Sequence, residues 1–266
     1  MPDCHSHLRI LMSKQPKIWR PASFADIVGK KNQEIVKRVQ LYAIKRSLLI
    51  LLLIGPYGSG KTALARLLMA SYCCHSPDET TADPCNTCEN CCQQGPDYNG
   101  VISHRYHWEI ECNQALSQEE LPSVVLEARQ TNKIALFVDE LGRLKERNGQ
   151  EALLKFVEDR KEGLIVGAVG YNLSDSSSNV QIIPPLYERM RKEYLSIPTT
   201  LELVSFFSQK AKEWEIQHEI SVLKEMVKRS QNNFRICLDI LDMAFQYKPR
   251  KLSTELLEAF LPPIQP

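Results

Sequence analysis

The amino-acid sequence predicts an α/β fold, in which a parallel sheet flanked by helices carries an inserted cysteine-rich module and is followed by a small all-α domain. Residues 48–54 form an unbroken apolar run that ends at Gly55, as expected for a strand buried on both faces. Residues 133–140 and 164–169 contain two further apolar stretches of strand length, the first of them beginning after Lys133, and segments with helical spacing precede and separate them. Beyond residue 200 the apolar pattern is helical only, which indicates a separate helical unit.

The composition excludes some classes of protein. The 266 residues contain 33 Lys and Arg against 32 Asp and Glu, so no overall charge attracts the chain to nucleic acid or to a membrane. Because we find neither an apolar run of membrane length nor a secretory signal, we expect a cytoplasmic protein without a membrane partner. Nine cysteines, an odd number and mostly clustered, favour metal binding in a reducing compartment over disulfides.

The chain is expected to begin with a loose tail over residues 1–17. Residues 18–29, which include Trp19, Arg20 and Pro21, then indicate an ordered segment that lies on the core. Such a segment either packs beside an adenine base, which needs apolar walls, or is a plain packing segment. A helix over residues 32–46 is expected to lead into the first strand.

Residues 55–62 match the phosphate-loop pattern G-x-x-x-x-G-K-[ST] between the first strand and a helix. Glycines let the backbone approach phosphate closely, and successive N–H groups with the helix N-terminus form an anion site. Lys61 is expected to reach the β- and γ-phosphates, and the Thr62 hydroxyl to ligate Mg²⁺. The alternative is a glycine turn that carries Lys-Thr by chance. Such a turn would require neither the strand before it nor the helix after it, and both are predicted here. The residues expected to contact the nucleotide are Gly55, Pro56, Tyr57, Gly58, Ser59, Gly60, Lys61, Thr62 and Ala63.

A cysteine-rich module is expected over residues 73–92. Cys85, Cys88 and Cys91 form two consecutive C-x-x-C units, and Cys74 or Cys73 can supply a fourth thiolate. Four thiolates suit a tetrahedral Zn²⁺ with no open position, so the ion would be structural. Whether Cys92 replaces Cys91 is left open by the spacing.

The second strand, residues 133–138, ends in Asp139 and Glu140. A carboxylate at the carboxyl end of a strand beside the phosphate loop is what Mg²⁺ coordination needs, which assigns this role to Asp139. Glu140 is then placed to orient or activate the attacking water.

The rest of the chain completes the division into units. Helices are expected over residues 118–129 and 150–159, a strand near 107–111, and helices near 200–214, 218–230, 233–246 and 254–261. Residues 197–199 resemble a linker, so we expect a nucleotide-binding domain over 18–197 and a helical domain over 198–266. Arg189 and Arg191 lie near the edge of the first domain, where arginines are usually solvated.

These motifs in this order resemble the AAA+ ATPases, and among them the gamma/tau subunits of bacterial DNA polymerase III clamp loaders. The resemblance covers roughly residues 19–246, and the cysteine insertion directly after the phosphate-loop helix is its most discriminating feature. It implies that Arg189 is an arginine finger acting in trans, and that Arg235 is the sensor-2 arginine of a helical lid. It also implies ATP hydrolysis at subunit interfaces to load or remodel a protein complex on DNA. The implied partners are other AAA+ subunits, DNA and a sliding clamp.

The sequence departs from that family at three places. Glu188-Arg189-Met190 stands where the family has Ser-Arg-Cys, so Arg191 competes as the finger. The third strand ends in Gly170-Tyr171 where the family has a hydroxyl residue as sensor 1, which leaves Asn172 as a candidate. We also expect no helical collar in the sequence given. A second hypothesis is therefore an ATP-dependent regulatory switch that holds an effector protein in a transposition or antiviral defence system.

Overall fold

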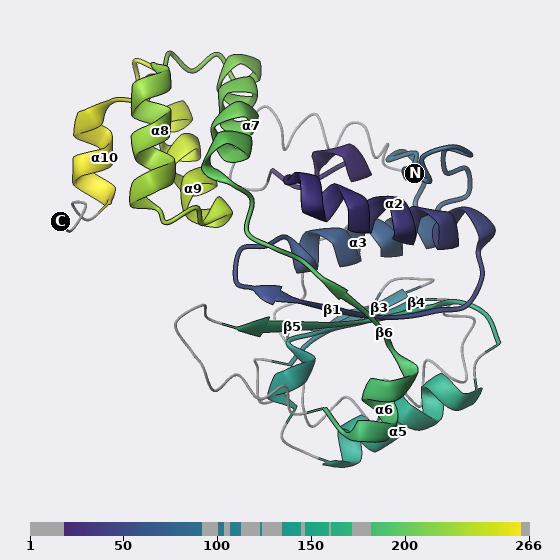
Figure 1. Cartoon of the computed structure of the whole chain (residues 1–266). Helices are drawn as coiled ribbons and strands as arrows, with labels where there is room; N and C mark the ends of the chain where they lie inside the picture. Colours follow the sequence, from purple (N-terminus) through teal and green to yellow (C-terminus); the bar gives the residue numbers. More distant parts are fainter. Residues whose placement is uncertain are drawn as a thin grey trace.

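The computed structural model describes residues 19–91, 101–103, 107–112, 123, 135–144, 147–159, 161–171 and 182–261. These residues form a six-stranded sheet of order β2-β3-β4-β5-β1-β6, in which β2 is antiparallel to β3 and the other neighbours are parallel (Figure 1). The strands are β1 (Leu49–Pro56), β2 (Val101–Ser103), β3 (His107–Glu111), β4 (Ala135–Asp139), β5 (Leu164–Tyr171) and β6 (Arg191–Tyr194). The predicted parallel sheet is thus confirmed, with β2 and β6 added to it.

Helices cover both faces of the sheet (Figure 1). One face carries α2 (Lys30–Lys45) and α3 (Lys61–Cys73), and the other carries α5 (Arg147–Asp159) and α6 (Pro184–Arg189). Along β1, Leu51 and Leu53 belong to the cluster under α2 and α3, whereas Leu52 and Ile54 belong to the cluster on the α5 side. Alternate side chains of one apolar strand therefore fill two cores, which is why the run has no polar residues.

Four helices form a bundle with an apolar cluster of its own. They are α7 (Thr200–Glu213), α8 (Ile220–Arg229), α9 (Phe234–Gln246) and α10 (Thr254–Phe260), close to the predicted spans. Three of them begin at a side-chain cap: Thr199, Asn233 and Ser253 each accept a hydrogen bond from the first turn of the helix that follows. The predicted boundary near residue 198 falls directly before the first cap.

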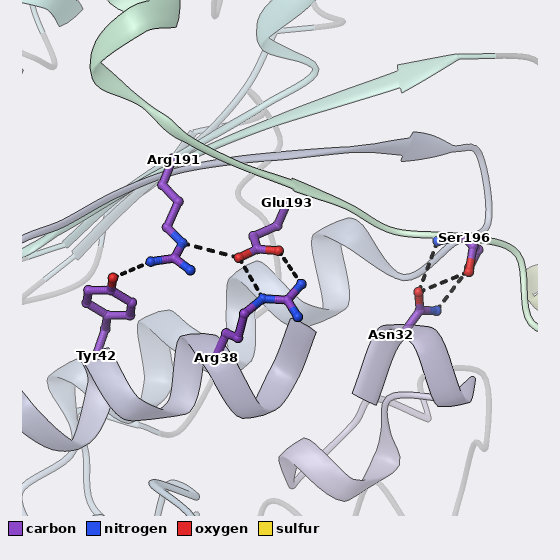
Figure 2. Close-up of polar contacts among 6 residues, drawn as sticks. All are labelled: Asn32, Arg38, Tyr42, Arg191, Glu193 and Ser196. Atoms are coloured by element: carbon purple, nitrogen blue, oxygen red, sulfur yellow. Dashed lines mark hydrogen bonds and ion pairs between the residues drawn. The ribbon is translucent and has the colours of Figure 1, made fainter. Parts of the chain in front are cut away.

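Polar contacts attach the bundle and β6 to α2. The Glu202 carboxylate accepts the backbone N–H groups of Lys30 at 2.6 Å and Thr199 at 2.7 Å, so a capping carboxylate of α7 also binds the start of α2. Figure 2 shows Asn32 of α2 joined to Ser196, the residue that follows Leu195 after β6. These contacts set the position of the bundle relative to the sheet.

Several expectations concern residues outside the described ranges: the tail over 1–17, Cys92, Asn172 and most of the helix over 118–129. In the part of the chain that the structure describes, no helix is both long enough and apolar enough to span a membrane.

Candidate nucleotide-binding site

The phosphate loop lies between β1 and α3, as the sequence predicts. Gly58 and Gly60 have φ angles of +82° and +93°, in the left-handed region that side chains with a Cβ rarely adopt. Helix α3 begins at Lys61, directly after Gly60, so its N-terminus opens onto the loop. The loop therefore has the backbone shape and the helix end that anion binding requires.

Lys61 is buried, with 6% of its surface exposed. Its Nζ donates to the carbonyl oxygens of Gly55 and Pro56, both at 2.9 Å. Burial lowers the pKa of this ammonium, against the opposing charges of Glu140 and Asp139. The loop thus holds a cation at its own centre, and that cation is available to a phosphate that displaces the carbonyl contacts.

Ser59 supplies a second observation that fits a bound anion. Its Oγ is buried, and among the described residues it has no hydrogen-bond partner. A buried hydroxyl without a partner is costly, so one inside a phosphate loop is explained by a ligand that accepts from it.

The expected Mg²⁺ ligands lie together. Thr62 Oγ1 donates to Asp139 Oδ2 at 2.9 Å, although the two residues come from different elements, α3 and the end of β4. Asp139 is 7% exposed and also accepts the backbone N–H of Glu140 at 3.0 Å. A hydroxyl and a carboxylate at hydrogen-bond distance beside a phosphate loop are oxygen donors that suit Mg²⁺.

Glu140 follows Asp139 with a φ of +53°, an uncommon backbone conformation for a residue other than glycine. Burial, with the neighbouring charge of Asp139, raises the pKa of its carboxyl group above the ordinary value. Its Oε2 lies 3.5 Å from the Tyr57 hydroxyl and 3.5 Å from Nε of Arg143. No sequence pattern indicates Arg143, and Tyr57 is predicted only as a residue of the phosphate loop.

The helical bundle reaches the same site. Asn233, the N-cap of α9, lies against the loop: a Cβ built on Gly58 would be 3.3 Å from Asn233 Oδ1. Two residues further along α9 is Arg235, whose positive charge adds to the effect of burial in lowering the pKa of Lys61. The role of Arg235 as a sensor-2 arginine, which the family resemblance implies, stays a prediction.

The two candidate finger arginines have different environments. Arg189, at the end of α6, forms an ion pair with Glu158 of α5 at 2.8 Å, and both side chains are 44% exposed. Arg191, in β6, donates to Glu193 at 3.2 Å and to the Tyr42 hydroxyl, with the Tyr42 ring centroid 5.0 Å away (Figure 2). Arg191 is paired with a buried carboxylate, whereas the groups that Arg189 contacts, the Glu158 carboxylate and the Pro185 carbonyl at 2.9 Å, are both exposed.

The cysteine cluster is separate from the phosphate loop. The sulfur atoms of Cys74, Cys85, Cys88 and Cys91 all lie within 4.8 Å of one another. A tetrahedral Zn²⁺ with Zn–S bonds of about 2.3 Å places its sulfurs about 3.8 Å apart. The sulfur–sulfur distances are 3.3 Å for Cys88 and Cys91, 3.6 Å for Cys85 and Cys91, and 4.0 Å for Cys88 and Cys74, and they fit such an ion. Cys73 instead packs in the core with α2 and α3, so the cluster contains Cys74.

The sheet order, the phosphate loop and the two acids define a class of protein. The chain belongs to the AAA family, described as "ATPase family associated with various cellular activities", whose model matches residues 51–195.

Two relatives of this chain are DNA polymerase III subunits of bacteria. The chain is 33% identical over 153 residues to DNA polymerase III subunit gamma/tau of Mycobacterium tuberculosis, which covers 55% of this chain and 25% of that one. It is 26% identical over 253 residues to DNA polymerase III subunit tau of Escherichia coli, which covers 91% of this chain and 36% of that one. The chain thus spans about a quarter to a third of the length of these relatives.

Among solved structures, the RuvB Holliday junction branch migration motor of Thermotoga maritima is similar, with a TM-score of 0.62 and 21% identity. The match covers 92% of this chain and 72% of that one. At this identity the similarity shows the fold alone.

Proposed function

We propose that this protein binds ATP with Mg²⁺ and hydrolyses it at a subunit interface, as a clamp-loader-type ATPase that loads or remodels a protein complex on DNA. The observation that carries the proposal is the contact between Thr62 and Asp139, which brings the phosphate loop and the acidic end of β4 to one point with Glu140 beside them.

The residues of this chain divide the chemistry between them. The backbone N–H groups of the loop and the Lys61 ammonium bind the phosphates, and Ser59 donates to a phosphate oxygen. Thr62 and Asp139 would hold Mg²⁺, which when bound neutralises charge on the phosphate oxygens. Glu140 accepts a hydrogen bond from the attacking water and orients it toward the γ-phosphate. Burial of these groups excludes bulk water and strengthens their electrostatic interactions.

Two arginines supply the remaining positive charge. Arg235 approaches the phosphates from the helical bundle, which then acts as a lid over the nucleotide. Arg189 acts in trans on ATP bound to a neighbouring subunit. Its ion pair with Glu158 is exposed and weak, so the arginine can exchange that carboxylate for a phosphate of the neighbour. An arginine in trans contributes about 10³- to 10⁵-fold to the rate in comparable phosphoryl transfers, so an isolated subunit is expected to hydrolyse poorly.

The cysteine cluster is proposed to hold one structural Zn²⁺. The surrounding segment is anchored on the sheet domain: Asn86 Nδ2 donates to the carbonyl of Ala22 at 2.9 Å, and the Phe24 N–H donates to Asp83 Oδ1 at 2.6 Å. A metal holding four thiolates would keep this segment against the N-terminal part of the chain.

The assembly on DNA is supported by the similarity to the DNA polymerase III subunits. It is tested by measuring steady-state ATP hydrolysis and ATP affinity over protein concentrations that allow assembly, with and without primed DNA. We expect DNA to stimulate hydrolysis, and Glu140→Gln to reduce it at least about 100-fold while ATP binding survives.

The exposed Glu162, replaced in the same way, is the matched control. Retention of hydrolysis in Glu140→Gln would refute the role of this carboxylate. Equal turnover with and without DNA would refute the DNA part of the proposal.

A further inference from the structure

Tyr57, in the phosphate loop, has its ring against the end of β5. A Cβ built on Gly170 would be 2.4 Å from Cε1 of Tyr57, closer than real Cβ contacts come. The Tyr57 N–H donates to the carbonyl of Tyr171 at 3.2 Å. The ring therefore requires glycine at position 170, and backbone pairing holds it there.

The Tyr57 hydroxyl lies close to the Glu140 carboxylate. It lies 3.5 Å from Glu140 Oε2 and accepts a hydrogen bond from Nη2 of Arg143 at 3.1 Å. Nε of Arg143 also lies 3.5 Å from the same Oε2 atom, so each of the three side chains contacts the other two.

The backbone of Arg143 is held beside Glu140 by a short helical turn. It ends η3 (Leu141–Arg143), and its N–H donates to the carbonyl of Glu140 at 2.8 Å. Leu141 of the same turn is fully buried against β5, where a Cβ on Gly167 would be 2.7 Å from it. The turn fixes the Arg143 backbone beside Glu140, although its side chain is exposed.

Tyr57 also contacts the phosphate-binding cation. Nζ of Lys61 lies 5.5 Å from the centroid of the Tyr57 ring, within the range of a cation–π interaction. One side chain therefore touches both Lys61, which binds phosphate in the proposed function, and Glu140, which orients the water.

We propose that Tyr57 is a positioning residue for ATP hydrolysis: its hydroxyl, held by Arg143, orients the Glu140 carboxylate toward the attacking water. The inference rests on the proposed ATPase function. The separation of 3.5 Å fits a contact that tightens when substrate binds, as catalytic hydrogen bonds commonly do. Glu140 has a strained backbone and a half-buried carboxylate, so its side chain needs such support.

The test replaces Tyr57 with Phe, which keeps the ring on Gly170 and removes only the hydroxyl. We expect kcat to fall about tenfold, as for the loss of one hydrogen bond to a charged group, while KM and the Kd for ATP change less than about twofold. Tyr247→Phe is the matched control, since Tyr247 directly follows α9 and has 59% of its surface exposed, and it is expected to retain kcat. A change in KM with kcat retained would overturn the proposal, because it would make Tyr57 a binding residue only.

A double-mutant cycle tests whether the effect passes through Glu140. If Tyr57 and Arg143 support one carboxylate, the double variant Tyr57→Phe, Arg143→Gln falls to about the kcat of the more impaired single variant. Losses that multiply would show independent roles and refute the inference.

Measurements on the wild-type protein distinguish failure of the proposed ATPase function from failure of the role assigned to Tyr57. No hydrolysis by wild type under any assembly condition would refute the proposed function itself. Hydrolysis by wild type with equal kcat in Tyr57→Phe would refute only the role of Tyr57.

Discussion

Because Arg189 and Arg191 make different contacts, we predict that replacing Arg191 lowers the stability of the protein, whereas replacing Arg189 lowers its rate of ATP hydrolysis. Arg191 donates to Glu193, a carboxylate with 5% of its surface exposed that also accepts two hydrogen bonds from Arg38, at 2.6 and 3.1 Å (Figure 2). Replacing Arg191 with Ala removes this bond and the Tyr42 contact, but Glu193 keeps Arg38. The loss is therefore smaller than the roughly 3–5 kcal/mol for breaking a buried pair.

We expect Arg191→Ala to lower the free energy of unfolding by about 1–2 kcal/mol, since one charge-assisted hydrogen bond is lost at a side chain that is 39% exposed. For a domain of this size that corresponds to a decrease in Tm of about 2–8 °C. Arg189→Ala removes an ion pair with both partners exposed, so its cost is about 0–1 kcal/mol. Denaturant titration of the two variants measures this difference.

Hydrolysis should show the opposite order. Arg189→Ala is expected to lose most of the assembled activity, about 10³-fold or more, and Arg191→Ala to retain it at temperatures where it is folded. Mixing Arg189→Ala with Glu140→Gln tests action in trans, because one mixed interface combines an intact Glu140 with an intact Arg189. We expect the mixture to recover activity that neither variant has alone.

The reasoning would be refuted by the reverse result: hydrolysis lost in Arg191→Ala without loss of stability, and retained in Arg189→Ala. A mixture with no more activity than its separate components would refute action in trans between copies of this chain.

Three further predictions follow from local contacts. Cys88→Ser should abolish binding of about one zinc per chain and lower Tm, whereas Cys237→Ser, in the bundle core, should leave the zinc content unchanged; bound metal is measured directly. Hydrogen bonds from Lys30 and Thr199 lower the pKa of Glu202, so its contribution to stability is present above pH about 4.5 and is lost as the pH falls below that value; Glu202→Gln should flatten the acid side of the stability curve measured by denaturation. Gly170→Ala should displace the Tyr57 ring and lower kcat without touching any polar group, and retained kcat would contradict that placement of the ring.

The parts of the site that the sequence predicted are those encoded by adjacent residues. The strand, the glycine loop and the helix that starts at Lys61 are contiguous, and Asp139 with Glu140 ends an apolar run, so one local pattern specifies each. Pairing of parallel strands then brings the two patterns to one edge of the sheet. Little long-range information was needed for the contact between Thr62 and Asp139.

The parts that sequence could not predict depend on contacts between distant residues. Tyr57 meets Arg143 across 86 positions, and Arg191 meets Tyr42 across 149. Neither pair has a spacing that a pattern could detect, so the sequence named Arg189 as the finger only through the family resemblance and left Arg191 as a competitor.

The fourth cysteine of the cluster posed a different problem, because Cys73 and Cys74 are neighbours. Only the end of α3 distinguishes them: Cys73 is its last residue and faces the core, whereas Cys74 has an extended backbone and turns toward the cluster.

The helical bundle contacts the phosphate loop through the N-cap residue of α9. A change in the shape of the loop can therefore alter the position of that helix. Asn233 both caps α9, by accepting the N–H groups of Arg235 and Ile236, and lies against Gly58 at the tip of the loop. A phosphate that reshapes the loop must therefore either keep this contact or move the start of α9 and Arg235 with it. Phe234, between them, packs on Trp19 with ring centroids 5.9 Å apart, so such a movement would extend to the N-terminal segment. Packed contacts of this kind do not deform freely. We therefore expect nucleotide binding at the loop to shift α9 as a whole rather than to move a single side chain.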